Sequence, residues 1–232
     1  MKIRRKSKEK STEGLINDCD SVVFSSYAYE KLSFLHNNYD HEVGGFGIAS
    51  DPKDPLYIDD VYITGQTSGP VSVEWSDKDL ADFYTEMSKQ GLQPYQFSRL
   101  WCHTHPDFAP FPSNVDVNTF DSTTFTDCSW ALMIIMGKDN ETYAEFKNND
   151  LKFQHKIDVV LDDYGDLDQI DDETYDYWEH QVENAVRIEK SRSRPISYLQ
   201  YGRNYENIDF PTRPNKIIDK FDVSETVNYF LS

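Results

Sequence analysis

The sequence predicts one α/β or α+β domain followed by a C-terminal extension, which a length of 232 residues accommodates. Strand-like and helix-like patterns alternate from about residue 21 to residue 160, which is typical of a sheet with flanking helices. The run Trp130–Gly137 (WALMIIMG) is apolar on both faces and therefore indicates a central strand. Hydrophobic residues make up only 38% of the chain, but 14 Phe, 15 Tyr and 4 Trp can still supply a packed core.

Short apolar segments separated by Asp-Pro and Gly-rich turns predict the strands. They are expected at 21–25, 43–49, 56–64, 71–75, 96–102, 130–137, 141–147 and 151–160. Apolar residues spaced three and four apart predict helices at about 27–39 and 76–91. The second helix has a start signal, with Ser76 as N-cap and Asp79 three residues later, and Gly91 is expected to end it.

Composition divides the chain into three parts. Residues 1–20 are expected to form a flexible basic lead-in, residues 21–160 the domain, and residues 161–232 the C-terminal extension. The extension begins with an acidic linker, because ten acidic residues and no Lys or Arg lie from 158 to 179. A helix is expected at about 171–190, with an apolar face that we expect to pack on the domain itself. The rest of the extension is irregular in pattern.

The charge of the chain excludes some partners. With 41 acidic against 23 basic residues, the net charge is −18 and the pI about 4.6, so we expect neither nucleic acid nor a membrane surface as a partner. The basic N-terminus has no apolar segment after it, and no run reaches the roughly 18 apolar residues of a membrane span. Three cysteines without a C-x-x-C spacing favour a reducing compartment. We therefore expect an intracellular, cytoplasmic protein, and leave its oligomeric state open.

The most informative segment contains His103-Thr104-His105-Pro106 and then Ser113-x-x-Asp116. Side chains alternate along a strand, so His103 and His105 at a strand end point to the same face. Together with an aspartate that the loop brings back, they offer two nitrogens and one oxygen to Zn²⁺ and leave a fourth position open. Neither the H-x-H pair nor the S-x-x-D segment is by itself specific for a metal site, since an H-x-H pair occurs by chance and S-x-x-D is also an ordinary helix start.

A metal-activated water also needs a carboxylate that accepts its proton and passes it to a leaving amine. Glu42 is the candidate, because it heads a predicted strand in which Gly44 and Gly45 permit close approach of neighbouring elements. Taken alone, Glu42 is better interpreted as an exposed strand-end glutamate beside a Gly-rich turn. Cys102 adjoins His103 but points to the opposite strand face, so we interpret it as a core cysteine rather than a nucleophile.

These residues resemble the JAMM motif of the MPN-type (JAB) metalloproteases, in which a glutamate on an upstream strand precedes His-x-His-x(7)-Ser-x(2)-Asp. The resemblance implies an MPN/JAB-like fold, with a mixed curved sheet flanked by helices. It also implies that His103, His105 and Asp116 bind zinc, that Glu42 is the general acid/base, and that Ser113 helps to stabilise the oxyanion.

The resemblance covers about residues 21–155 and implies hydrolysis of an amide bond without a covalent intermediate. Ubiquitin-like protein modifiers are common substrates in the family, so the leading hypothesis is a zinc-dependent isopeptidase with a protein substrate. A phage or bacterial processing peptidase acting on structural or cell-wall peptides is an alternative with the same fold. A non-catalytic MPN scaffold is a second alternative, although such members usually lose metal ligands.

Overall fold

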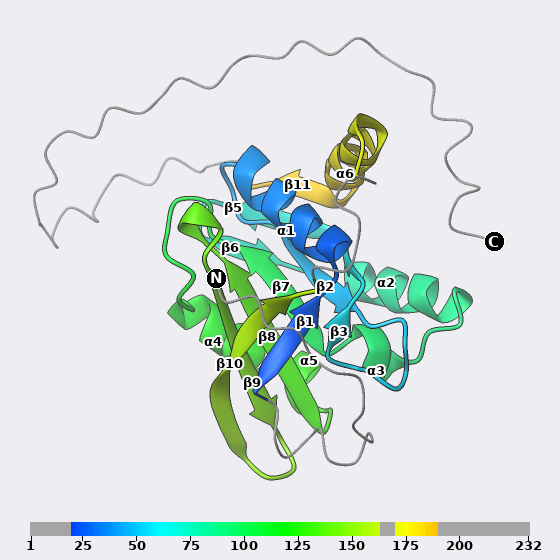
Figure 1. Ribbon diagram of the computed structural model, residues 1–232, viewed down its shortest axis with the longest axis vertical. Helices are drawn as coiled ribbons and strands as arrows, with labels where there is room; N and C mark the ends of the chain where they lie inside the picture. Colours follow the sequence, from blue (N-terminus) through cyan, green and yellow to red (C-terminus); the bar gives the residue numbers. More distant parts are fainter. Residues whose placement is uncertain (1–19, 163–169, 190–232) are drawn as a thin grey trace, which may run out of the picture. The chain divides into compact units, whose positions relative to one another are not determined.

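The computed structural model describes residues 20–162 and 170–189, which belong to one compact unit (Figure 1). The predicted lead-in except Asp20, most of the acidic linker, and the chain from residue 190 onward lie outside the described residues. The boundaries between the three predicted parts of the chain therefore stay predictions.

A mixed eight-stranded sheet forms the centre of the unit. Its strands are β1 (Ser21–Phe24), β2 (Gly44–Ile48), β3 (Tyr57–Ile58), β4 (Asp60–Tyr62), β7 (Leu100–Thr104), β8 (Trp130–Met136), β9 (Thr142–Asn148) and β10 (Phe153–Leu161). They lie in the order β3-β1-β10-β9-β8-β7-β2-β4. β7 runs parallel to β8, and β1 runs parallel to β3 and β10, while the other neighbours are antiparallel.

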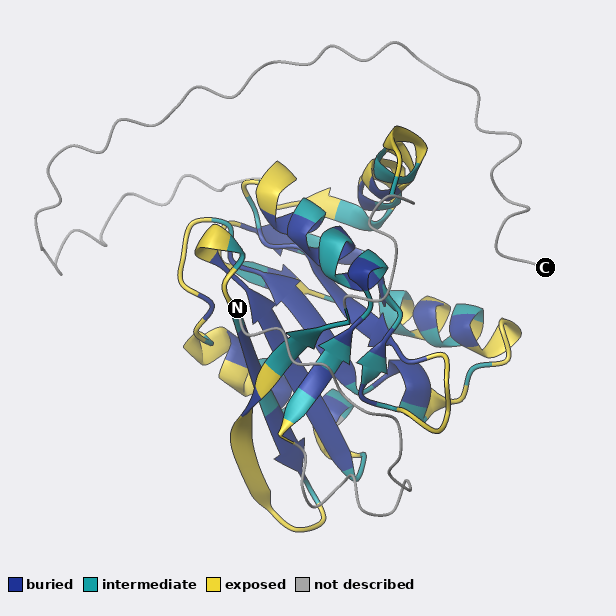
Figure 2. Cartoon of the chain, in the orientation of Figure 1, coloured by how far each residue is buried: buried dark blue, intermediate teal, exposed yellow. Residues whose placement is uncertain are grey.

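Helices cover both faces of this curved sheet, so the predicted α/β (α+β) class is confirmed (Figure 1). Residues of α1 (Ser26–Asn38) pack in the core on one face. The core on the other face includes residues of α2 (Asp77–Lys89), α3 (Pro94–Phe97), α4 (Asn114–Phe120) and α5 (Thr123–Thr126). Every residue of β8 is buried, which confirms the predicted central strand (Figure 2). A 3₁₀ turn at Lys138–Asn140 joins β8 to β9.

A second, three-stranded sheet contains β5 (Gln66–Gly69), β6 (Ser72–Glu74) and β11 (Val186–Ile188), with β5 in the middle. β11 pairs in parallel with β5 and directly follows helix α6 (Asp172–Ala185). Within the described ranges, no helix combines the length and the apolar character needed to cross a membrane.

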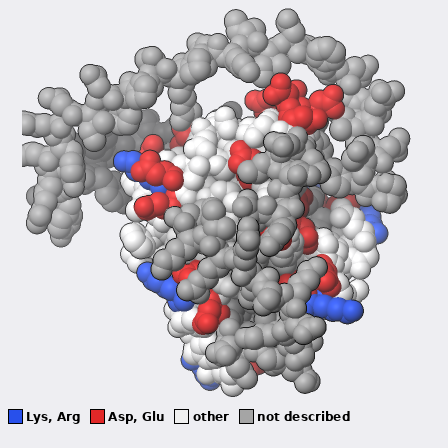
Figure 3. Space-filling model, viewed as in Figure 1, with Lys and Arg blue, Asp and Glu red and all other residues white. Residues whose placement is uncertain are grey.

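Helix α6 packs on α1 through the apolar face that the sequence predicts. Trp178 is fully buried, and its Nε1 donates to Tyr27 Oη at 2.8 Å. Tyr175 Oη donates to Glu30 Oε1 at 3.0 Å. The opposite face of α6 is exposed and acidic, and the red group at the top of Figure 3 lies where Figure 1 places this helix. Its exposed acidic residues are Asp172, Glu173, Asp176, Glu179 and Glu183.

Two of the predicted strands need correction. The strand predicted at 96–102 is wrong in its first part, which belongs to α3, and β7 begins only after it. The cause is local, because Pro94 suits the first helical position and Gln96 Oε1 accepts a hydrogen bond from Gln93 N–H at 3.0 Å. The strand predicted at 56–64 is interrupted and forms the two short strands β3 and β4.

Strands β5 and β11 are absent from the sequence prediction, which continues the last helix to residue 190. The helix instead ends at Ala185, and β11 follows it. β5 (QTSG) contains no apolar residue, although it pairs with the neighbouring β6, and β11 depends on pairing with a distant part of the chain, with Val186 opposite Gln66. A local pattern of apolar residues carries no information about such a partner.

Replacing Trp178 by Ala should lower the free energy of unfolding by about 3–5 kcal/mol, because it opens a cavity between α6 and α1. Urea denaturation followed by circular dichroism measures this change. Leu151→Ala is the control, since Leu151 is 61% exposed. It should change the free energy by less than about 0.5 kcal/mol. Equal effects of the two substitutions would contradict the packing of α6 on α1.

Candidate metal centre

Strand β7 brings two histidines to the same side of the sheet. His103 lies within β7, opposite Gly44 of β2 and Ile135 of β8. His105 follows the strand, and its N–H still donates to Met136 O at 2.8 Å. Both histidines are buried, and their ring centroids are 5.1 Å apart. The predicted arrangement of the two rings on one face is therefore confirmed.

Helix α4 brings Asp116 to these histidines. Ser113 is the N-cap of the helix, since its Oγ accepts from Asp116 N–H at 3.2 Å while Asp116 Oδ2 accepts from Ser113 N–H at 2.6 Å. The motif thus forms the helix cap that the sequence leaves open as an alternative. The same cap fixes a buried carboxylate against the histidines, so capping and ligation are compatible.

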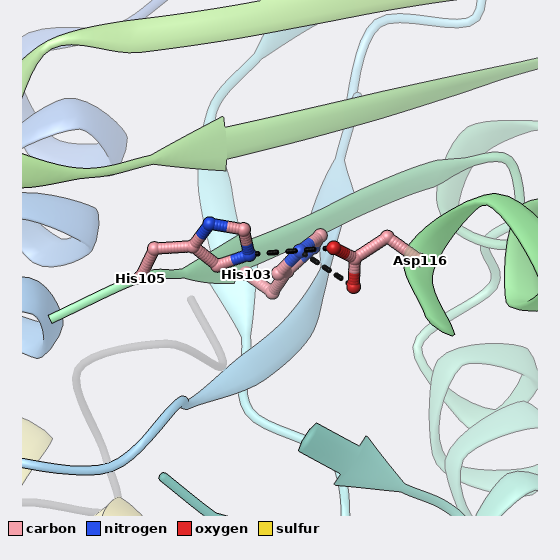
Figure 4. A group of neighbouring side chains, drawn as sticks. All are labelled: His103, His105 and Asp116. Carbon is pink, nitrogen blue, oxygen red and sulfur yellow. Dashed lines mark ion pairs between the residues drawn. The ribbon is translucent and has the colours of Figure 1, made fainter. Parts of the chain in front are cut away.

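The three side chains converge on one place (Figure 4). His103 Nε2 lies 3.2 Å from Asp116 Oδ1, and His105 Nε2 lies 3.4 Å from Asp116 Oδ2. One ligand atom from each residue lies within 4.8 Å of the others. Ligands held about 2.0–2.1 Å from a tetrahedral zinc ion are roughly 3.4 Å from one another, which is close to these separations. The buried group could therefore hold a metal ion.

The ring nitrogens also fit the donor set of a cation. Within the described part of the chain, both ring nitrogens of His103 and Nε2 of His105 form no hydrogen bond, although the two Nε2 atoms lie at ion-pair distances from Asp116. Buried polar atoms usually have a hydrogen-bond partner, so nitrogens without one are available to a cation. His105 Nδ1 lies 3.4 Å from Ala109 O, which can accept a hydrogen bond from Nδ1–H. That contact favours the tautomer in which Nε2 turns its lone pair toward the group.

Glu42 reaches the same place from another part of the chain. Its Oε1 lies 3.6 Å from His105 Nε2, and its side chain is only 6% exposed. β2 begins at Gly44, so Glu42 lies just before the strand and not in it. A Cβ on Gly45 would lie 2.3 Å from Tyr62 O, which confirms the close approach predicted for the paired glycines. The interpretation of Glu42 as an exposed strand-end residue is wrong.

Thr104 is a residue of the site that the sequence reasoning missed. Its N–H donates to Val43 O at 3.1 Å, and its Oγ1 accepts from Val43 N–H at 3.0 Å. These reciprocal bonds join Thr104, which lies between the two histidines, to Val43, which adjoins Glu42. Apart from its place between His103 and His105, no sequence signal marks Thr104, because its partner is 61 residues away.

Burial and charge set the protonation of the group. Burial raises the pKa of Glu42 to about 7; His105 opposes this increase and Asp116 adds to it. Burial lowers the pKa of His103 despite the attraction of Asp116. Burial disfavours the charged form of Asp116, but its interactions with His103 and His105 outweigh burial and lower its pKa. Burial likewise disfavours the charged form of His105, but its interactions with Asp116 and Glu42 outweigh burial and raise its pKa. Asp116 is thus held as the ionised carboxylate that a metal ligand must be.

Cys102 faces away from the group. It is fully buried in the core shared with α1, and burial raises the pKa of its thiol to about 12. His103 instead stacks on Trp101, which belongs to the core on the opposite face of the sheet, with ring centroids 4.5 Å apart. The interpretation of Cys102 as a core cysteine is confirmed.

Comparisons with known proteins add little to this geometry. No protein-family model and no curated protein matches the sequence. A solution structure of a protein from Desulfitobacterium hafniense is 14% identical, with a TM-score of 0.47, and the match covers 62% of this chain and 95% of that one. A solution structure from Salinibacter ruber is 15% identical, with a TM-score of 0.32, and the match covers 58% of this chain and 86% of that one. Both TM-scores are too low to carry an argument.

The purified protein should contain about one divalent metal ion per chain, and His103→Ala should remove it by deleting one of three ligands. Elemental analysis after dialysis against metal-free buffer measures the content. His180→Ala is the matched control, because His180 lies on the exposed face of α6, and it should leave the metal content unchanged. A wild-type protein that retains no metal, even after incubation with zinc, would contradict the assignment.

Proposed function

We propose that this chain is a zinc-dependent amide hydrolase of the JAMM/MPN (JAB) type, which removes a ubiquitin-like or related protein modifier. One observation carries the proposal. Two buried histidines and a buried aspartate converge from β7 and α4, and a buried glutamate from a third segment lies 3.6 Å from one of the histidines. The mixed curved sheet with helices on both faces adds support for the fold that the resemblance implies.

His103, His105 and Asp116 are the residues that would hold the zinc ion. Two imidazole nitrogens and one carboxylate oxygen are a ligand set typical of catalytic zinc, with a further position for water or substrate. When bound, zinc supplies Lewis-acid polarisation of a carbonyl and acidifies a water molecule. A non-catalytic scaffold needs neither a complete ligand set nor an adjacent buried carboxylate, so the geometry favours a hydrolase.

Glu42 is the proposed general acid/base. Burial raises its pKa above the ordinary value of a glutamate, which suits a group that must accept and then donate a proton. The ionised carboxylate accepts the proton of the attacking water. The protonated carboxyl then donates this proton to the amine nitrogen as the C–N bond breaks, and Glu42 returns to its initial state. The products are a carboxylic acid and an amine, which become a carboxylate and an ammonium ion at neutral pH, with no covalent bond to the protein.

Ser113 is the proposed oxyanion donor. Its Oγ accepts a hydrogen bond from Asp116 N–H, and a hydroxyl that accepts a bond still has its own hydrogen to donate. The helix cap fixes the position of this hydroxyl next to the ligand Asp116. A donor fixed before the reaction stabilises the charge that develops on the carbonyl oxygen.

The substrate class rests on the resemblance to the JAMM/MPN family. We propose a cytoplasmic protein substrate that carries its modifier through an isopeptide bond. A panel of ubiquitin-like fusions and cell-wall peptides tests this class against the alternative of a phage or bacterial processing peptidase. Cleavage of cell-wall peptides alone would favour that alternative.

Glu42→Gln should keep the metal but lower kcat by about 10²- to 10⁴-fold, because the amide cannot accept the proton. Steady-state kinetics on a cleaved fusion, with metal analysis of the same preparation, measures both quantities. Glu74→Gln, on the exposed part of β6, is the matched control and should retain full activity. Undiminished activity of Glu42→Gln would assign the proton transfer to another group.

A chelator should abolish hydrolysis, and added zinc should restore it. A thiol-alkylating reagent should leave the hydrolytic activity of the folded protein unchanged. Cys102 is fully buried and its thiol pKa is raised to about 12, so it neither meets the reagent nor acts as a nucleophile. Activity assays before and after each treatment make the comparison. Inhibition by alkylation alone would point to a thiol enzyme instead.

A further inference from the structure

We propose that Gln66 is a positioning residue for Glu42, and that β11 and α6 hold the strand of Gln66 in place. The proposal rests on the proposed function, in which Glu42 is the general acid/base. It assigns a role to the part of the chain after residue 170, which the sequence places outside the domain that carries the site.

The segment that carries Glu42 is hydrogen-bonded to β5 as well as to β7. Glu42 N–H donates to Gly69 O at 3.0 Å. Gly44 N–H donates to Gln66 Oε1 at 2.8 Å, and Gln66 Nε2 donates back to Gly44 O at 2.6 Å. Backbone on both sides of Val43 is therefore fixed by β5.

Gln66 uses its whole side-chain amide for this purpose. The residue is fully buried, and its Nε2 also donates to Thr64 O at 2.9 Å. Ser68 Oγ donates to its Oε1 at 3.1 Å. A buried amide with every polar atom bonded holds one orientation, since any rotation leaves buried groups without partners.

Strand β5 is itself held from the C-terminal side. β11 pairs with β5 from Gln66 to Ser68, and Glu189 N–H donates to Ser68 O at 2.8 Å. Arg187 of β11 forms a forked ion pair with Asp79 at the start of α2, with N–O distances of 3.2 and 2.6 Å.

Apolar packing connects α6 to the same place. Val43, the neighbour of Glu42, shares a buried cluster with Val182 of α6, and Ala185 and Val186 pack against this cluster. The segment from α6 to β11 thus lies directly behind the backbone that carries Glu42. An error of about 1 Å in the position of a catalytic group costs on the order of 10²-fold in rate, so this support has a functional consequence.

Gln66→Met tests the proposal, because Met fills similar space without either hydrogen-bonding group. The chain offers a matched control in Gln96, which is also buried and supports the opposite end of β2. Gln96 Nε2 donates to Ala49 O and Ser50 O, at 3.0 and 2.9 Å. Gln66→Met should lower kcat by about 10- to 100-fold, with KM and metal content within about twofold, whereas Gln96→Met should leave kcat within about twofold. An equal loss of kcat in both variants would reduce Gln66 to a structural residue and overturn the proposal.

Amide hydrogen exchange provides a readout that does not depend on activity. In Gln66→Met the amides of Glu42 and Gly44 should exchange at least about tenfold faster, while in Gln96→Met only the amide of Gln93, which donates to Gln96 Oε1, should do so. Unchanged exchange at Glu42 and Gly44 would overturn the proposal. If the wild type hydrolyses no substrate, the proposed function fails, and exchange still decides whether Gln66 holds this segment.

Two further substitutions keep the test decisive if Gln66→Met does not fold. Gln66→Asn and Gln96→Asn retain an amide but shorten it by one methylene, and the same difference in kcat and exchange is expected between them. For β11, Arg187→Met removes the ion pair to Asp79 of α2, whose side chain is 11% exposed, and should speed exchange at Gly44 by about threefold. Lys78→Met removes the exposed ion pair with Asp82, also on α2, and should not. Identical exchange in these two variants would exclude β11 from the support of Glu42.

Discussion

The reciprocal hydrogen bonds between Val43 and Thr104 are the contact on which the candidate site depends. Thr104 lies between the two histidines, and Val43 lies beside Glu42, so two bonds set the distance between the metal-binding group and the carboxylate. β7 can make this contact because it lies in the interior of the sheet, antiparallel to β2 and parallel to β8. Because β7 is hydrogen-bonded to a neighbour on each side, its side chains have little freedom, and a catalytic site requires side chains held in fixed positions.

Electrostatics supply the second constraint. Asp116 and Glu42 are both buried, and their carboxylates face histidines rather than Lys or Arg. Removing carboxylates from water is costly unless positive charge compensates them. In this protein the compensation is incomplete, as the raised pKa of Glu42 indicates. A divalent cation between the histidines and Asp116 would complete it, so the arrangement favours metal binding.

The sequence predicts the local parts of this site and misses the nonlocal ones. His103, His105 and Asp116 lie within 14 consecutive residues, so strand alternation and a helix-cap motif are enough to bring them together. Most strands and both long N-terminal helices are predicted for the same reason. Gln66 and its strand could not be found in this way, because β5 (QTSG) has no apolar residue to mark it, and its contacts with Val186–Ile188 and with the backbone around Gly44 are nonlocal. The helical turn at Pro94 is different, since its proline is a local signal that the strand prediction overlooked.

The structure also shows where part of the acidic segment of the chain lies. Five exposed carboxylates lie on the outer face of α6, whereas its inner face packs behind Val43 and carries the fully buried Trp178. A segment that composition marks as an appendage is therefore, in its described part, a supporting layer of the site.

X-ray absorption or anomalous scattering at the zinc edge tests the central claim most directly, because it identifies the metal and its ligands together. We predict one zinc ion bound by Nε2 of His103, Nε2 of His105 and a carboxylate oxygen of Asp116, each about 2.0–2.2 Å from the metal, with Glu42 outside the ligand set. A zinc ion bound by cysteine sulfur, or at any other group of residues, would contradict it.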